Sequence, residues 1–567
     1  DTHYILVTKL SALVAGRTRR RNKTFVCPYC LHCMTEDHVL KEHMKLCRDH
    51  KPQVVEYPKE GNNILKFKKW FKTLPVPFSV YMDFESFLVP TQNNGTKHVP
   101  SGFAAIRVGT DDKHTDKVHC YSDAADDSDH DHVMREVFKY LEIQDRYAQK
   151  ILSNNSSMKL SAADEKNFRD ATHCYVCHEN FREKQLKKVR DHDHLSSNEV
   201  SNYRVAACNA CNLALKPRHG KSRFTSEGGY FIPIFLHGGS GYDFHLILKQ
   251  FSKRFTEDEI AVIPSNTEKF IGFTIGNFRF LDSCKFLTAS LDSLTQNLIK
   301  SGKDKFRHTK AEFGDSDLVF RKGVYCYEYM TGPDKFLETK LPPREAFYSQ
   351  LNEHELSADD YKVAEETWNT FECKTLKDYH DFYLKLDVTL LADIFENFRA
   401  VARSTYGLDP AHYWSLPGYS WDACLKQTKV ELELLTEKDA QMYLFIESAI
   451  RGGVSMIAHR HAVANNGVGS DVTKPVSYLA YWDANNLYGW AMSQSLPTGR
   501  FRWLEGVEVE SFTPDKIVNI ADDADTGYFF EVDLEYPDHL HHLHNSLPLA
   551  PERVIVDKEM YSPYTAS

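Results

Sequence analysis

The stretch FSVYMDFESF, at residues 78–87, is the part of the sequence from which the fold is best read. Its aromatic and β-branched residues favour a strand, and loop residues bound it. Asp83 and Glu85 stand two positions apart, so both side chains project from the same face of that strand. Neighbouring carboxylates repel each other unless a cation lies between them, which makes the pair a candidate metal site. An Asp-x-Glu pattern is common, however, and is weak evidence by itself.

A second segment, IPIFLHGGSGYDFHLIL at residues 232–248, predicts a buried strand, a glycine-rich turn and the start of a helix. It places another acid, Asp243, directly after the turn. Strand-like patterns extend over residues 230–236 and recur at 476–482.

A long amphipathic helix is predicted around residues 382–398, followed by Gly407 and Pro410 beyond its end. Within it, YLKLD places Tyr383 and Asp387 one helical turn apart. Strands and helices mixed over several hundred residues predict α/β and α+β domains in series. The apolar stripe of the helix is formed by Phe382, Leu386, Leu390, Leu391, Ile394, Phe395 and Phe398.

Four acids from three separated segments resemble the DEDD-type 3′-5′ exonucleases, and their order and spacing resemble the exonuclease motifs of family B DNA polymerases. The resemblance implies a ribonuclease H-like fold in which the acids hold two divalent ions, Mg²⁺ or Mn²⁺, and Tyr383 orients the attacking water. The second motif usually has Asn where Gly238 stands, so we expect a weaker grip on the single-stranded 3′ end. The four acids are Asp83, Glu85, Asp243 and Asp387.

The first cysteine cluster, in FVCPYCLHCMTEDHVLKEHMKLC at residues 25–47, has the pattern C-x2-C-x12-H-x3-C. A helix would place the histidine and the last cysteine on one face, opposite a knuckle formed by the first pair. Four ligands without an open position are typical of a structural Zn²⁺ site. The spacing leaves open whether this finger contacts DNA or only stabilises the N-terminal region. The ligands are Cys27, Cys30, His43 and Cys47.

CYVC and CNACN supply a second closed zinc set. Between them VRDHDH contributes Asp191 and His192, which with Asn212 resemble the working residues of the recombination endonuclease VII group of His-metal finger nucleases. The resemblance implies that Asp191 and Asn212 hold a divalent ion while His192 activates water. Arg204-Val205 stands where that group usually has Arg-Gly, and a zinc module without cutting activity is an equally open interpretation. The zinc ligands are Cys174, Cys177, Cys208 and Cys211.

LAYWDANNLYGWAMSQSLP, at residues 479–497, resembles motif A of family B polymerases, in the form found in Polinton (Maverick) and related viral polymerases of the protein-primed type. The resemblance implies that Asp483 ends a strand and binds catalytic Mg²⁺. The backbone at Leu487 would lie against the incoming dNTP, and Tyr488 would pack under its sugar.

Upstream, SAIRGGVSMIAHRHAVANN resembles the linker between exonuclease and palm, which contacts the template backbone through Arg451, Gly452 and Gly453. Residues 489–567 contain neither Asn-Ser-x-Tyr-Gly or Asn-Ser-x-Phe-Gly nor Asp-Thr-Asp, the motifs that complete nucleotide binding and the second metal ligand. We therefore expect a partial palm with motif A only, in a C-terminally truncated chain that retains at most the exonuclease.

These motifs predict a multidomain protein with small zinc modules. The expected limits are 1–55 for the N-terminal region with its zinc finger, 75–410 for the exonuclease domain, 165–220 for the endonuclease VII-like insertion, and 411–567 for the linker and partial palm.

A length of 567 residues is enough for several domains, and 42% hydrophobic residues is ordinary for a globular protein. No apolar run approaches the roughly 18 residues of a membrane span, so we expect no membrane partner. A net charge of -10 argues weakly against nucleic-acid binding over the whole surface. Eight of the thirteen cysteines fall in the two clusters, which is typical of metal sites in a reducing compartment.

Three functions remain open on the sequence. The first is a replicative polymerase that uses a DNA primer-template, dNTPs and a terminal priming protein, in the nucleus or at a viral replication site. The second is a nuclease that works through the carboxylates, through His192 or through both. The third is a zinc-stabilised, non-catalytic DNA-binding relic of a mobile element.

Overall fold

The computed structural model divides the chain into two compact units, one of Asp1–Leu65 with Glu431–Ser567 and one of Lys66–Val430. The described residues are 25–34, 36–49, 56–91, 95–123, 132–153, 156–196, 198–215, 230–251, 255, 260–266, 269–350, 353–450, 452, 455–547, 549–550 and 557–566. None of the helices in these ranges is both long and apolar enough to span a membrane.

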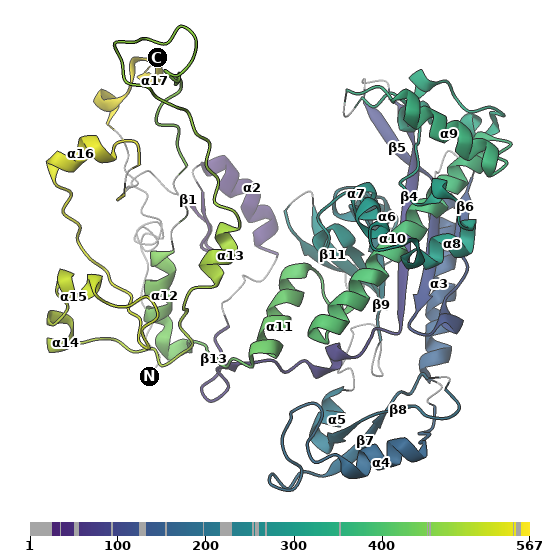
Figure 1. The fold of residues 1–567 in the computed structure, drawn as a ribbon, viewed down its shortest axis with the longest axis horizontal. Coiled ribbons are helices and arrows are strands. Elements are labelled where there is room, and N and C mark those ends of the chain that lie inside the picture. Colours follow the sequence, from purple (N-terminus) through teal and green to yellow (C-terminus); the bar gives the residue numbers. More distant parts are fainter. Residues whose placement is uncertain are drawn as a thin grey trace. The chain divides into compact units, whose positions relative to one another are not determined.

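A seven-stranded sheet with the order β10-β11-β12-β9-β4-β5-β6 forms the centre of the Lys66–Val430 unit (Figure 1). β9 pairs in parallel with β12 and with β4, whereas the other neighbours are antiparallel. β4 is thus an internal strand, held by hydrogen bonds on both sides. The strands are β4 (Phe78–Pro90), β5 (Thr96–Gly109), β6 (His119–Ser122), β9 (Ile232–Leu236), β10 (Ile260–Pro264), β11 (Phe270–Ile275) and β12 (Phe278–Asp282).

Helices cover both faces of this sheet (Figure 1). On one face, α3 and α6 share a hydrophobic core with alternate residues of β4, such as Val80 and Met82. On the other face α10 packs against the sheet, and its Phe395 ring contacts Tyr81 and Phe235. The helices of this unit are α3 (His132–Ser153), α4 (Ala162–Asp170), α5 (Asn209–Leu215), α6 (Asp243–Phe251), α7 (Leu291–Ile299), α8 (Arg307–Phe313), α9 (Ala358–Thr370), α10 (Leu376–Tyr406) and α11 (Leu416–Thr428).

The mixed α/β multidomain architecture predicted from the sequence is confirmed. The helix predicted around residues 382–398 is the core of α10, which Thr375 caps by accepting a hydrogen bond from the Asp378 backbone N–H. It ends at Gly407, whose φ of +63° is the left-handed conformation that glycine adopts most readily.

The other unit contains two short strand pairs, β1 with β2 and β3 with β13, and several short helices. The strand predicted at residues 476–482 is wrong, because these residues form no strand and pair with no strand in the described chain. Their side chains are exposed, Tyr481 at 95% and Trp482 at 89%. The elements are β1 (Phe25–Val26), β2 (Cys33–Met34), α2 (Asp37–Cys47), β3 (Ile64–Leu65), β13 (Leu432–Glu433), α12 (Ala440–Ala449), α13 (Leu487–Met492), α14 (Val507–Glu510), α15 (Pro514–Val518), α16 (Asp538–His544) and α17 (Pro563–Ala566).

Candidate active site

β4 carries the first two acids on the sheet face that α10 covers. Asp83 is two residues beyond Tyr81, whose ring packs on α10, and Glu85 is two residues further. The register between β4 and β5 shifts at Glu85, and such a bulge redirects the side chains beside it. Glu85 is only 9% exposed, so its charge has little access to water.

The third acid follows the turn at the end of β9. Gly238 has a φ of +82°, a conformation that glycine accepts without strain. Its N–H donates to Asp282 Oδ1 at 2.9 Å, and the Ser240 N–H donates to Asp282 Oδ2 at 3.1 Å. The Asp282 carboxylate therefore fixes the turn, and Asp243 becomes the first, buried residue of α6.

α10 supplies the fourth acid, Asp387, and one turn earlier the buried Tyr383. The Tyr383 ring stacks on Tyr325 with 4.7 Å between centroids. Its hydroxyl lies 2.6 Å from that of Tyr327. A Cβ at Gly323 would lie 2.7 Å from the Tyr383 ring, so this close approach requires glycine.

The four carboxylates lie close enough to influence each other's ionisation. Burial, and then the charges of the other three acids, raise the pKa of Asp83 well above its usual range. Burial and the charge of Asp387 raise the pKa of Glu85 to about 8. Burial raises the pKa of Asp243 to about 7. Buried carboxylates that repel one another in this way favour protons or cations in the site.

Lys322 is the one cation that the described residues place in this group. Its Nζ lies 3.4 Å from Asp387 Oδ2. Burial raises the pKa of Asp387, and the charge of Lys322 opposes that shift. A single lysine leaves most of the negative charge of four ionised acids uncompensated.

The donor set fits divalent cations, which prefer carboxylate oxygens. Asp387 Oδ1 is buried and has no hydrogen-bond partner among the described residues, so it can accept a ligand. No three of the four acids have oxygens that all lie within 4.8 Å of one another; the described groups that meet this limit are the two cysteine sets. Any ions would therefore be held by subsets of the acids.

Sequence patterns did not reveal Lys322, Tyr325 or Tyr327. They lie in the stretch after α8, whose only described regular elements are 3-10 turns such as Tyr327–Tyr329, too short to give a periodic sequence pattern. Only the packing of this stretch against α10 shows that they line the site.

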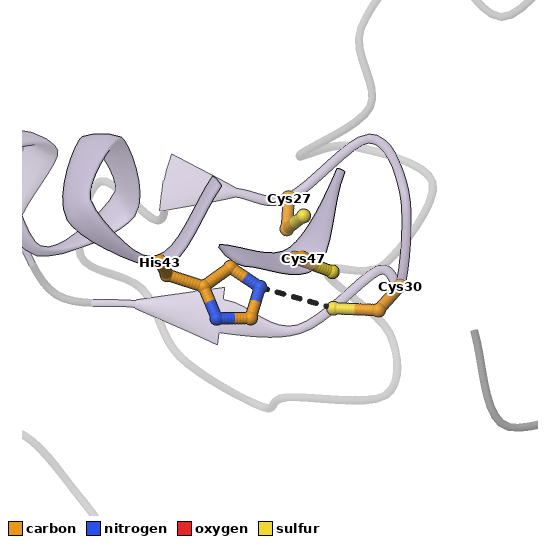
Figure 2. Close-up of side chains that lie close together, drawn as sticks. All are labelled: Cys27, Cys30, His43 and Cys47. Atoms are coloured by element: carbon orange, nitrogen blue, oxygen red, sulfur yellow. Dashed lines mark hydrogen bonds between the residues drawn. The ribbon is translucent and has the colours of Figure 1, made fainter. Parts of the chain in front are cut away.

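In each of the two predicted zinc sets, the four ligand side chains come together. In the first, the Cys30 Sγ lies 3.3 Å from His43 Nε2, and the side chains of Cys27 and Cys47 point toward the same space (Figure 2). In each set the four ligand atoms lie within 4.8 Å of one another, as a tetrahedral Zn²⁺ site requires. The second set is formed by Cys174, Cys177, Cys208 and Cys211.

The second set holds the β7–β8 hairpin (Lys188–His192 and Tyr203–Cys208) and α5. Asp191 is buried at 6% exposure, and both of its oxygens accept hydrogen bonds from Arg204, at 2.7 and 3.0 Å. The His192 ring lies 4.2 Å from that of His194. Asn212 lies on α5, partly buried. Asp191 is thus engaged by a guanidinium at both of its carboxylate oxygens.

The residues predicted to form the palm site lie in the other unit. Asp483, Leu487 and Tyr488 are exposed, and Asn486 begins α13 with its side chain accepting a hydrogen bond from the Gly489 N–H at 3.2 Å. Gly452 is exposed, whereas Arg451 and Gly453 lie outside the described residues.

A central sheet, several domains and two cysteine sets that could bind zinc define the class, a mixed α/β multidomain protein. A family model described as DNA polymerase type B, organellar and viral, matches residues 232–561. The chain belongs to this family. Membership supports a protein-primed type B polymerase that performs DNA-directed DNA synthesis on a primer-template from dNTPs with divalent ions. No curated protein and no solved structure matches the chain.

Proposed function

We propose that this polymerase chain removes nucleotides from DNA 3′ ends through a DEDD-type site in a ribonuclease H-like domain. The observation that supports this most is the gathering of four carboxylates, from β4, α6 and α10, into one buried group with raised pKa values. Surface acids would be solvated and would not shift in this way.

The residues of the site divide the work of phosphodiester hydrolysis. Asp83, Glu85, Asp243 and Asp387 would hold divalent ions, which supply charge stabilisation and a water nucleophile of lowered pKa. The Tyr383 hydroxyl, held by that of Tyr327, orients a water molecule. Lys322 favours the ionised form of Asp387 against the effect of burial and offers a positive charge to the phosphate.

The test is degradation of a 5′-labelled single strand and a 3′-mismatched duplex by the purified chain with Mg²⁺ or Mn²⁺. We expect stepwise loss from the 3′ end, abolished in Asp83→Ala/Glu85→Ala with DNA binding retained. The matched control, Glu365→Ala/Glu366→Ala, removes two exposed acids of α9 and should degrade normally. Unchanged excision in the Asp83→Ala/Glu85→Ala variant would disprove the assignment.

For the zinc-held hairpin we propose a structural role without cutting activity. The reason is the bidentate Arg204 pair at Asp191, which leaves that carboxylate unavailable to a metal. Internal cuts in the same assay, lost in His192→Ala, would instead assign nuclease activity to this module and an endonuclease VII-like mechanism.

In the polymerase region we propose that Asp483 binds catalytic Mg²⁺ while Leu487 and Tyr488 contact the dNTP, with Arg451–Gly453 on the template. The Asp-Ala-Asn-Asn-Leu-Tyr-Gly sequence supports a Polinton-like origin, a terminal priming protein and replication in the nucleus or at a viral replication site. Tyr488→Ala should weaken dNTP binding, measured as the apparent Kd for dNTP by a primer-template complex.

A further inference from the structure

A second group of charged side chains lies in the Lys66–Val430 unit, away from the carboxylates. It consists of three cations and one acid, surrounded by aromatic rings. We call it the Arg279 cluster, and its members are Lys69, Lys72, Arg279, Asp422, Phe231, Tyr413 and Trp414. The acid already accepts hydrogen bonds from both lysines, Lys72 at 3.0 Å and Lys69 at 3.5 Å.

Arg279 is the unusual member. Its guanidinium carbon lies 3.9 Å from the ring centroid of Phe231 and 4.7 Å from that of Trp414. It donates from Nη1 to the His412 carbonyl at 3.3 Å, but its Nε is buried without a hydrogen-bond partner among the described residues. Arg279 forms no ion pair among the described residues, and burial lowers its pKa to about 10.

Lys72 adds a second, poorly solvated cation beside it. Its side chain is only 12% exposed, and its Nζ lies 3.6 Å from the ring centroid of Tyr413. Burial lowers its pKa to about 8, and the charges of Lys69 and Arg279 act in the same direction. Asp422 pairs with the two lysines and leaves Arg279 without an anion among the described residues. An unpaired buried guanidinium is unfavourable unless an anion joins it.

The cluster is separate from the candidate active site along the sheet. Arg279 is opposite Pro233, near the start of β9, whereas Asp243 follows the turn after the end of β9. The two lysines come from residues 66–74, which precede β4, and the aromatic rings come from the loops before β9 and α11.

We propose that the Arg279 cluster binds a backbone phosphate of DNA. A guanidinium with free donors, a nearby ammonium and flanking aromatic rings form the combination by which proteins hold single-stranded nucleic acid. This inference rests on DNA being the substrate of the chain, but it does not depend on whether the carboxylate site excises nucleotides.

The test is the salt dependence of binding between the full chain and a 5′-labelled oligothymidylate of roughly 20 nucleotides, a length that spans typical single-strand sites. Calcium replaces magnesium so that the strand stays intact, and the measured binding constant therefore does not depend on excision. Lys69→Gln and Arg279→Gln should each lower the slope of log Kobs against log salt by about 0.7, the value for one lost phosphate contact. Lys68→Gln, an exposed neighbour outside the cluster, removes the same charge and should leave the slope unchanged.

An unchanged slope in Lys69→Gln would overturn the proposal. Equal losses in Lys68→Gln and Lys69→Gln would also overturn it, because they would show a general charge effect and no specific site. If Arg279→Gln loses its near-ultraviolet circular dichroism, the exposed Lys69 variant decides the question alone.

Discussion

Lys322 Nζ lies 3.4 Å from Asp387 Oδ2, although the two residues come from separate segments of the chain. Lys322 opposes the rise that burial produces in the pKa of Asp387. We expect Lys322→Met to reduce excision by about 10- to 100-fold, as when a group supporting a metal ligand is removed. The acidic limb of the pH–rate profile should move to higher pH, because the pKa of Asp387 rises when the charge of Lys322 is removed. Excision rates measured across pH report both effects.

Two variants control this experiment. Lys322→Arg keeps the positive charge and should retain the wild-type acidic limb. Lys310→Met removes a lysine that pairs with Asp315 at 3.1 Å on the surface, and it should change nothing. A profile that does not move in Lys322→Met would exclude Lys322 from the site.

Binding of Mn²⁺ to the carboxylate group should tighten as pH rises between about 6 and 8. The pKa values of Asp243, about 7, and Glu85, about 8, lie above their ordinary values, so both acids carry protons at the lower pH. A metal ion binds the carboxylate form and releases those protons. Calorimetry in buffers of different ionisation enthalpy measures the protons released, and release should disappear in Asp83→Ala/Glu85→Ala. Affinity independent of pH would contradict the raised pKa values.

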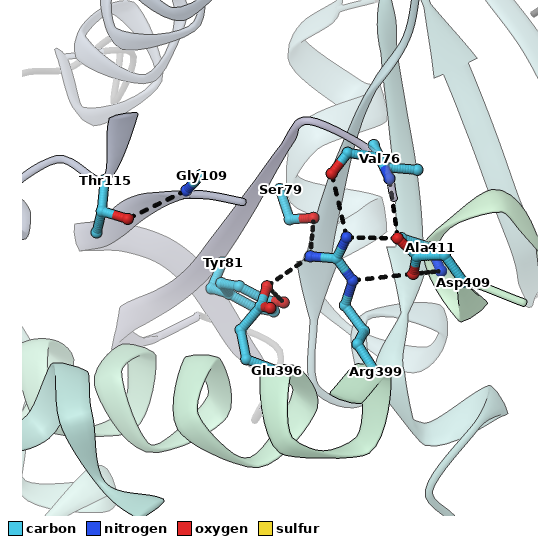
Figure 3. Close-up of polar contacts among 9 residues, drawn as sticks. All are labelled: Val76, Ser79, Tyr81, Gly109, Thr115, Glu396, Arg399, Asp409 and Ala411. Atoms are coloured by element: carbon cyan, nitrogen blue, oxygen red, sulfur yellow. Dashed lines mark hydrogen bonds and ion pairs between the residues drawn. The ribbon is translucent and has the colours of Figure 1, made fainter. Parts of the chain in front are cut away.

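Arg399 on α10 and Asp409 form a buried ion pair in which Nε donates to Oδ1 at 3.0 Å and Nη2 to Oδ2 at 2.6 Å (Figure 3). Arg399 also donates to the Val76 carbonyl and the Ser79 hydroxyl, which ties α10 to the start of β4. We expect Arg399→Met to lower the free energy of unfolding by about 3 to 5 kcal/mol, because it leaves a buried carboxylate unpaired. Urea denaturation followed by tryptophan fluorescence measures this loss.

The double variant Arg399→Met/Asp409→Leu should recover most of the stability, since apolar replacements of a buried pair are often neutral. Burial would raise the pKa of Asp409, but Arg399 overcomes this and holds it well below the usual range. The pair therefore contributes stability above the ordinary pKa of an aspartate, and that contribution declines as pH falls through the lowered value. Equal stability of wild type and Arg399→Met at neutral pH would refute the prediction.

Removal of zinc should unfold the β7–β8 hairpin, because a closed zinc site contributes directly to folding. Cys208→Ser should lower the bound zinc by about one ion per chain and speed amide exchange across residues 188–208. Cys424→Ser, at an exposed cysteine outside both sets, should keep full zinc content. Hairpin amides that stay protected after chelation would show that the fold does not depend on the metal.

The sequence anticipated the features that depend on short spacings. Asp83 and Glu85 share a strand face, Tyr383 and Asp387 share a helix face, and both cysteine sets were identified from their ligand spacing. Each of these follows from the fixed period of a strand or helix, or from the reach of a metal knuckle. The predicted strand at 476–482 failed for the opposite reason, because a strand requires a partner that its own sequence does not supply.

The amino-acid sequence by itself therefore determined which acids, tyrosines and cysteines are available and how neighbours are oriented. Only the tertiary structure decided that Lys322 meets Asp387, that Tyr327 holds Tyr383 and that Arg204 engages Asp191. Each contact joins residues of two different segments, and the periodic pattern of one segment does not show which other segment packs against it. The contacts of Lys322 and Tyr327 form only when the stretch after α8 packs against α10, and that of Arg204 forms only when β8 pairs with β7. Their energy therefore depends on packing that local sequence does not encode.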